Sequence, residues 1–321
     1  MYVTTFGYIA SGLVPNCAEG GQLYVFRGKG KKGKLVRQVT VQSSSCNLLG
    51  IGFSPAGTLF VIDFGTAQVL TVDPESGAAS VFWTAPAGPT GAWLNGLTFD
   101  AQGNVYVSDS FSGTIYQLNG NTGAYIASIQ DPLLEPNKTY GVPSFGANGL
   151  AFNKAGDALF VTNTADDTIV KIPVLAGTPG TPPTFSKPEV FTNSINGADG
   201  LVLDACDNIW VAANQADEID VVDPTGMVIA KLGDFGGVDK HGKPIGLLFP
   251  ASLAFSENGK FLYISNLALD LRLVDLPQAV DSQWASMVGT YTISAVKPKI
   301  KPIGHVPRHN NCKNGNNNGR H

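Results

Sequence analysis

Three polar residues occupy one position of a repeated sequence pattern, and their side chains have the chemistry of ligands for a hard cation. Asn95, Asn148 and Asp199 each stand directly before a Gly-Leu pair, separated by 53 and 51 residues. Amide and carboxylate oxygens suit Ca²⁺ or Mg²⁺ better than zinc. If the fold brings these positions together, we predict a site of two amides and one carboxylate. The same residues also have a structural interpretation, because Asn-Gly and Asp-Gly satisfy turn amides at strand starts.

The surrounding pattern recurs five times and predicts the elements that position these residues. Each copy has a Gly-Leu-x-Phe-like core, a turn, a second apolar run and a polar stop, and two further strand-like runs follow. Successive copies begin 46, 53, 51 and 52 residues apart. Four short strands about every 50 residues are typical of a propeller blade.

We therefore predict one all-β domain, a six-bladed β-propeller with four-stranded antiparallel blades around a central channel. The N-terminal region forms an incomplete blade, in which residues 1–5 align with a second strand. Its first strand is expected from residues 300–306, unless the chain begins inside a blade; five blades plus a cap are the alternative. The predicted blades are residues 1–45, 46–92, 93–145, 146–196, 197–248 and 249–300, and a basic, disordered tail is expected at 301–321.

Two rings of residues are expected at one mouth of the channel. The first strand of each blade lines the channel, and the residue before each glycine begins that strand. The second strand runs back to the same face, so its polar terminal residues lie slightly further out. Local hydrogen bonds at the strand ends are the preferred explanation for these outer-ring residues. The functional alternative is that they bind the substrate. The inner ring is Leu49, Asn95, Asn148, Asp199 and Ala251, and the outer ring is Asp63, Asp109, Asn163, Asn214 and Asn266.

The body of the chain contains one histidine, His241, in a long connection at residues 234–250. An exposed loop position is its ordinary interpretation; as an alternative, it could overhang the mouth and shuttle protons to a substrate. A His-dependent catalytic triad is not expected, and no GxSxG sequence occurs. A second long connection, at residues 131–147, could also roof the mouth.

Charge and composition exclude several classes of protein. The net charge is −4, but residues 297–321 hold six basic residues and no acid, so the body is acidic. An acidic body argues against nucleic-acid binding, and no apolar run is long enough for a membrane span. We expect a monomer that acts on a small-molecule substrate. Low charge, one Asn-Lys-Thr sequon and the possible bridge between Cys17 and Cys46 favour an extracellular or periplasmic location.

The order Asn95, Asn148, Asp199 on consecutive blades, in the sequences Asn-Gly-Leu, Asn-Gly-Leu and Ala-Asp-Gly-Leu, resembles the senescence marker protein/gluconolactonase/luciferin-regenerating-enzyme-like family. The resemblance implies a calcium-dependent hydrolase of lactones or related esters. It implies that Asn95 and Asn148 are metal ligands, and that Asp199 is a ligand and also the catalytic base or nucleophile. The implied cofactor is Ca²⁺, with Mg²⁺ as the alternative.

One member of the family's ligand set has no counterpart here. The family has a Glu on the first strand of its first blade, and our alignment places that position about ten residues before Met1. Glu19 is the nearest Glu, but it lies in a Gly-rich connection rather than at a strand start.

The main alternative function is a non-catalytic propeller of the NHL-repeat type, which binds protein or glycan on its loop face. A full oxygen cage on the axis favours the enzyme, whereas a mouth closed by Leu49 and Ala251 with aromatic residues on the rim favours the binding protein. A strictosidine-synthase-like enzyme or a metal-dependent lyase shares the expected fold, but no sequence motif points to either.

Overall fold

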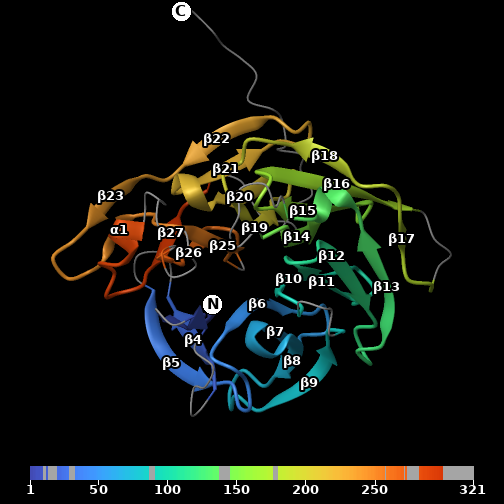
Figure 1. Ribbon diagram of the computed structural model, residues 1–321, viewed down its shortest axis with the longest axis horizontal. Helices are drawn as coiled ribbons and strands as arrows, with labels where there is room; N and C mark the ends of the chain where they lie inside the picture. The colour runs from blue at the N-terminus through green and yellow to red at the C-terminus, as the bar shows by residue number, and fades with distance from the viewer. Residues whose placement is uncertain are drawn as a thin grey trace, which may run out of the picture.

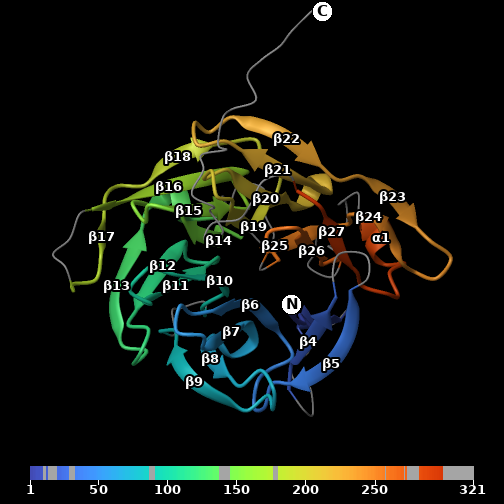
Figure 2. The same ribbon diagram turned by 180° about the vertical axis from the view of Figure 1, so that it is seen from behind.

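The structure is a computed structural model that describes residues 1–9, 12–13, 20–28, 33–86, 91–136, 145–175, 180–256, 258–270, 272 and 282–298. Six antiparallel sheets are arranged like blades around a central axis (Figures 1 and 2). The predicted six-bladed β-propeller is therefore confirmed. The predicted residues 300–306, the tail at 301–321, and Cys17 and Glu19 lie outside the described residues.

Three blades have the predicted four strands in simple up-and-down order. In each of them the chain passes from the axis to the periphery through successive hairpins. The second blade comprises β6 (Leu48–Phe53), β7 (Leu59–Asp63), β8 (Gln68–Val72) and β9 (Ala79–Thr84); the third β10 (Leu94–Phe99), β11 (Val105–Asp109), β12 (Thr114–Leu118) and β13 (Tyr125–Gln130); and the fifth β19 (Ala198–Leu203), β20 (Ile209–Ala213), β21 (Glu218–Val222) and β22 (Val228–Leu232).

The other blades depart from this scheme among the described residues. The first and sixth each show three strands, and the fourth has an additional outer strand. These blades are β1 (Tyr2–Thr4), β4 (Gln22–Arg27) and β5 (Lys34–Thr40); β14 (Ala147–Phe152), β15 (Ala158–Asn163), β16 (Thr168–Leu175), β17 (Thr184–Phe185) and β18 (Glu189–Thr192); and β25 (Pro250–Phe255), β26 (Leu262–Asn266) and β27 (Ile293–Val296).

Short elements complete the described fold. Two small hairpins lie outside the blades: β2 (Tyr8–Ile9) pairs with β3 (Gly12–Leu13), and β23 (Phe235–Val238) pairs with β24 (Pro244–Gly246). The single turn of α-helix is α1 (Ser282–Ala285), and the 3-10 turns are η2 (Phe64–Thr66), η3 (Pro132–Leu134) and η5 (Asn214–Ala216). In the part of the chain that the structure describes, no helix is long and apolar enough to cross a membrane.

The core lies between the blades. The second strands are buried on both faces, and all five residues of β7, β11 and β20 are buried, which explains their nearly continuous apolar sequence. Large aromatic residues on these strands contact a phenylalanine at the end of the next inner strand. Tyr106 meets Phe152 with ring centroids 4.9 Å apart, and Phe60 meets Phe99 at 5.4 Å. Aromatic pairs add about 0.5–1.5 kcal/mol each to the burial energy.

Strand β1 takes the place of a second strand, as the sequence alignment predicts. The hydroxyl Oγ1 of Thr4 donates to the carbonyl oxygen of Leu49 in the next blade, at 2.7 Å. Ser108 on β11 and Thr162 on β15 make the same bond to the carbonyls of Asn148 and Asp199. Residue Phe6 of the first blade is thus equivalent to the residue that follows β11, Ser110.

Candidate functional site

Each inner strand contains a β-bulge at the residues predicted to face the channel. The strands begin one residue earlier than predicted, at Leu48, Leu94, Ala147, Ala198 and Pro250. In β10 the pairing register shifts between Leu94 and Leu97, and β14, β19, β6 and β25 shift at the equivalent point. A bulge leaves residues unpaired and redirects their side chains, so Asn95, Asn148 and Asp199 are released from the sheet pattern.

Close backbone contact brings the bulges of neighbouring blades together. A Cβ atom on Gly96 would lie 2.6 Å from the carbonyl oxygen of Asn148, and one on Gly149 would lie 2.6 Å from that of Asp199. Gly50 approaches Asn95 and Gly200 approaches Ala251 in the same way, at 2.5 Å. Only glycine permits this approach. The five predicted inner-ring positions therefore form a continuous arc, in blade order, at one mouth of the channel.

Three consecutive blades carry polar side chains at this mouth, and each is paired with a polar residue 15 or 16 positions later. The amide Nδ2 of Asn95 donates to Oγ of Ser110 at 3.1 Å, and Nδ2 of Asn148 donates to Oγ1 of Thr164 at 3.0 Å. In the fifth blade, Nδ2 of Asn214 donates to Oδ2 of Asp199 at 3.1 Å. We call these three pairs the polar half of the mouth.

The hydroxyl groups of the polar half fix the orientation of the amides. Ser110 donates its own hydrogen to the carbonyl of Ala147, and Thr164 donates to that of Ala198, both at 2.7 Å. Each hydroxyl can therefore only accept from its asparagine, which must present its NH₂ group. The Oδ1 atoms of the two asparagines lie on the opposite side of the amide, and no described residue donates to them.

Asp199 is the one charged residue of the inner ring. Burial raises its pKa to about 7, while hydrogen bonds from the side chains of Asn214 and Asn148 and from the backbone N–H of Gly200 oppose that rise. A carboxyl group with such a pKa exchanges protons near neutral pH. Perturbation of this kind is typical of functional sites.

The remaining blades carry apolar residues at the same two positions. In the second blade Leu49 and Phe64 replace the amide and the hydroxyl, and in the sixth blade Ala251 and Leu267 do so. The first blade has Phe6 at the second of these positions. We call these residues the apolar half of the mouth. The mouth is thus neither a full oxygen cage nor an apolar plug.

The predicted outer-ring residues are buried and bonded to the loops around the mouth. Asp109 accepts from the backbone N–H of Trp93 at 2.9 Å, Asn163 donates to the carbonyls of Leu133 and Glu135, and Asn266 donates to Thr292 and Ser294. Asp63 accepts from Ser45. Their structural role is clear, and the substrate contacts of Asp109, Asn163 and Asn266 stay a prediction.

The structure moves Asn214 out of the outer ring. Ala213, rather than Asn214, pairs with Ala198 at the end of the second strand. Asn214 follows it, is 3% exposed and bonds to Asp199, so it is equivalent to Ser110 and Thr164. The sequence assignment was one residue late because blade five has an apolar alanine where the other blades have a polar stop.

His241 lies apart from the site residues. It belongs to the exposed turn between β23 and β24, a hairpin at the outer rim of the disc (Figures 1 and 2). Its backbone N–H donates to Asp239. The structure does not bring this histidine to the mouth, and its role toward substrate is left as a prediction.

The donor set of the polar half fits a hard cation. The described residues contain no group of three His, Cys, Asp or Glu side chains that could hold a metal. Two amide oxygens and one carboxylate, held by Ser110, Thr164 and Asn214, are ligands of the kind that Ca²⁺ or Mg²⁺ takes together with water. The single negative charge favours modest affinity.

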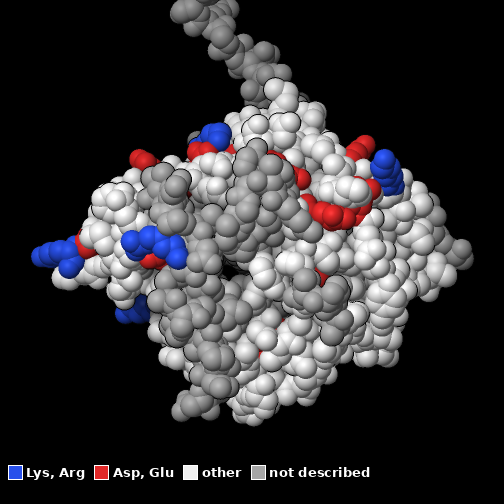
Figure 3. Space-filling model, in the orientation of Figure 1, with Lys and Arg blue, Asp and Glu red and all other residues white. Residues whose placement is uncertain are grey.

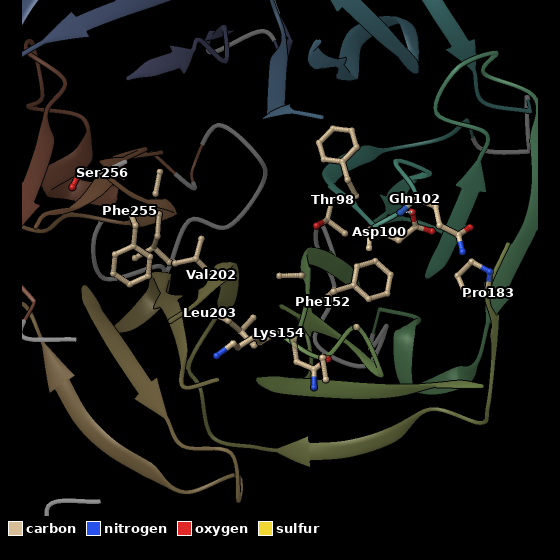
Figure 4. Close-up of a pocket in the computed structure, with 18 residues that line it drawn as sticks. Thr98, Asp100, Gln102, Phe152, Lys154, Pro183, Val202, Leu203, Phe255 and Ser256 are labelled. Atoms are coloured by element: carbon tan, nitrogen blue, oxygen red, sulfur yellow. Dashed lines mark hydrogen bonds between the residues drawn. The ribbon is translucent and has the colours of Figure 1, made fainter. Parts of the chain in front are cut away.

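A groove of about 750 Å³ opens at the other end of the channel (Figure 4). It is lined by the last residues of the inner strands, such as Phe99, Phe152 and Phe255, and by the turns that follow them. The carboxylate of Asp100 in this groove is occupied by Asn104 and by the hydroxyl of Tyr106, 3.0 Å away. The one carboxylate among the residues that line the groove is therefore already hydrogen-bonded within its own blade.

Comparisons with known proteins agree with this fold. Residues 137–233, which include Asn148 and Asp199, match the family described as "SMP-30/Gluconolactonase/LRE-like region". No curated protein sequence gives a significant match. One similar solved structure is a candidate gluconolactonase, with 16% sequence identity, coverage of 94% of this chain and 91% of that chain, and a TM-score of 0.56. A second is an auxiliary nutrient binding protein from Bacteroides thetaiotaomicron, with 12% identity, coverage of 77% of this chain and 64% of that chain, and a TM-score of 0.53. A third is virginiamycin B lyase from Staphylococcus aureus, with 13% identity, coverage of 83% and 81%, and a TM-score of 0.49.

At these identities the first two structures support the fold and not an activity. The family match covers the fourth and fifth blades, where two of the three polar residues of the inner ring lie. The six sheets around one axis show a six-bladed β-propeller, and residues 137–233 within it are similar to the SMP-30/gluconolactonase/LRE-like family.

Proposed function

We propose that the chain is a divalent-metal-dependent hydrolase of lactones or related esters, with its site at the polar half of the mouth. The observation that carries the proposal is the shared orientation of Asn95 and Asn148, whose NH₂ groups are bound to hydroxyls while no described residue donates to their oxygens, in the same arc as Asp199, which accepts from the Asn148 side chain. The family match over residues 137–233 supports the same activity.

The residues of the polar half have distinct roles in this proposal. Asn95, Asn148 and Asp199 hold the cation, which when bound supplies Lewis-acid polarisation of the substrate carbonyl. Asp199 accepts a proton from the attacking water and returns it to the leaving alkoxide. Direct attack by the Asp199 carboxylate is the alternative route. Asn214 is a positioning residue that holds Oδ2 of Asp199.

Calcium titration by calorimetry tests the metal site. Protein stripped with a chelator is titrated with Ca²⁺, and lactone hydrolysis is followed in parallel. We expect one saturable site that is lost in Asp199→Asn and retained in Asp157→Asn, a matched change at an exposed carboxylate outside the mouth. Absence of binding to the wild-type chain, or equal binding to both variants, would contradict the proposal.

A non-catalytic binding propeller is the second candidate, and the apolar half of the mouth favours it. Phe6 and Phe64 lie with ring centroids 5.5 Å apart on this half, and aromatic residues on a rim are common in interaction sites. A wild-type chain that binds no cation and hydrolyses no lactone, but captures a protein or glycan ligand that Phe64→Ser abolishes, would support this alternative.

We also propose an exported, monomeric protein. Cys46 and Cys206 each take part in a disulfide bond, and stable disulfides favour an extracellular or periplasmic location. All residues of the polar half come from one chain, so the site needs no second copy. Sedimentation of the purified protein, with and without Ca²⁺, tests the monomeric state.

A further inference from the structure

We propose that a row of aromatic side chains beside the polar half binds an apolar, uncharged substituent of the substrate. The substrate class would then be lactones or esters that carry an alkyl or aryl side chain, rather than sugar lactones. This inference rests on the proposed function for the reaction. The aromatic row itself is defined by Phe6, Phe64, Trp93, Phe111 and Phe145.

The rings of the aromatic row form one continuous contact across four blades. Phe64 lies between Phe6, at 5.5 Å, and Trp93, at 6.0 Å between ring centroids. Trp93 also contacts Phe111 at 5.0 Å and Phe145 at 5.4 Å. Trp93 is therefore the centre of the row. Its ring and those of Phe111 and Phe145 are only half-buried, so apolar surface remains for a ligand.

The backbone joins the aromatic row to the polar half. Trp93 stands two residues before Asn95, and its carbonyl accepts from the N–H of Ser110 at 2.9 Å. Phe111 follows Ser110 directly, and Phe145 stands three residues before Asn148. The turn that carries the orienting hydroxyl of Ser110 thus also carries the ring of Phe111 and is bonded to the backbone of Trp93. A substrate whose carbonyl lies at the amides would extend its side chain toward these rings.

Charge at the mouth argues for an uncharged substituent. None of the inner-ring residues, their partners or the aromatic-row residues is basic, and Asp199 is the one acid among them. On the face of the disc shown in Figure 3, the described Lys and Arg side chains lie away from the central opening. Among the described residues of the mouth, an anionic group would therefore lack a counter-charge. A polyhydroxylated group would lose hydrogen bonds to water against the rings, which costs free energy.

The test uses two matched sets of ligands, lactones for hydrolysis and the corresponding lactams for binding without reaction. Each set has an unsubstituted, a pentyl-substituted and a phenyl-substituted five-membered ring, and glucono-δ-lactone serves as the polar substrate. The proteins are the wild type, Trp93→Ala, the milder Phe145→Leu, and Trp83→Ala as a matched control. Trp83 lies on β9, the outermost strand of the second blade; it contacts Tyr116 at 4.9 Å and makes no ring contact with the row.

We expect the wild type to prefer the substituted rings over the unsubstituted one by about tenfold or more, because each buried methylene contributes about 0.8 kcal/mol. Trp93→Ala should lose most of this preference in both kcat/KM and lactam affinity, Phe145→Leu should lose part of it, and Trp83→Ala should keep it. Thermal unfolding of each variant checks that it is folded.

Equal affinity of the wild type for substituted and unsubstituted lactams would overturn the inference, as would an equal loss of preference in Trp93→Ala and Trp83→Ala. The same experiment tests the proposed hydrolase activity independently of the aromatic row. If no lactone is hydrolysed but lactam binding still depends on the substituent and on Trp93, the aromatic row is supported as a binding site and the hydrolase is not.

Discussion

The two halves of the channel mouth share one backbone and differ in chemistry. Blades three, four and five place Asn95, Asn148 and Asp199 at the bulge, whereas blade two places Leu49 there. The bulge and the close glycine contact are present in both halves: Gly50 approaches the carbonyl of Asn95 as Gly149 approaches that of Asp199. The repeat therefore supplies the geometry, and the side chain at one position decides whether a blade contributes oxygen or apolar surface.

The largest expected difference between the halves concerns catalysis. Asp199→Asn in the polar half should lower kcat/KM for a lactone by about 10³-fold, because it removes the proton acceptor and the one ligand charge. Leu49→Asn in the apolar half should change it by less than about tenfold, since no hydroxyl orients an amide there. Steady-state kinetics in saturating Ca²⁺ measures both. Equal losses would mean that the polar half has no special role.

Because the two halves share one backbone geometry, replacing the closely packed glycine should destabilise the protein equally in either half. Gly149→Ala and Gly50→Ala should each lower the free energy of unfolding by about 3 kcal/mol, because the new methyl group would meet a carbonyl oxygen at 2.6 or 2.5 Å. Urea unfolding compares them with the wild type. A large cost in only one of the two variants would show that the halves differ in backbone as well as in side chains.

When no cation is bound, protonation of the Asp199 carboxyl group should make the stability of the protein depend on pH, and the apolar half has no such group. Because burial raises the pKa of Asp199 to about 7, against about 3.9 in an unfolded chain, the folded state binds more protons between these values. The free energy of unfolding should therefore fall as pH rises from 4 to 7, on the order of 3 kcal/mol more in the wild type than in Asp199→Asn. Urea unfolding in chelator at several pH values measures this, and parallel pH profiles would argue against it.

The smallest effect concerns the hydroxyl partners. Ser110→Ala should weaken Ca²⁺ binding by about tenfold, because loss of an orienting partner typically costs ten- to a hundredfold in metal affinity. Ser112→Ala is a matched control, since Ser112 bonds to Asp109 and not to the inner ring. Calorimetry compares the two. An unchanged affinity in Ser110→Ala would show that Asn95 is oriented by other contacts.

The repeat allowed the fold and the inner ring to be predicted, because Gly-Leu spacing reports the blade period directly. The hydroxyl partners of the inner-ring asparagines were not predicted. Ser110 and Thr164 follow the polar stop and resemble ordinary turn residues, and only their offsets of 15 and 16 residues from Asn95 and Asn148 distinguish them. The aromatic row was also missed, since Phe64, Trp93 and Phe145 are distant in sequence and belong to loops outside the repeated core.

The hydroxyl bonds between blades also imply an order of maturation. Ser110 can fix the amide of Asn95 only after the carbonyl of Ala147 has docked, and Thr164 can fix Asn148 only after Ala198 has docked. During synthesis each ligand therefore waits for the blade that leaves the ribosome after it. A nascent chain that ends within the fourth blade would lack the carbonyl of Ala198 and hold Asn148 loosely, so competence for the cation would arise late, when the fifth blade closes against the fourth.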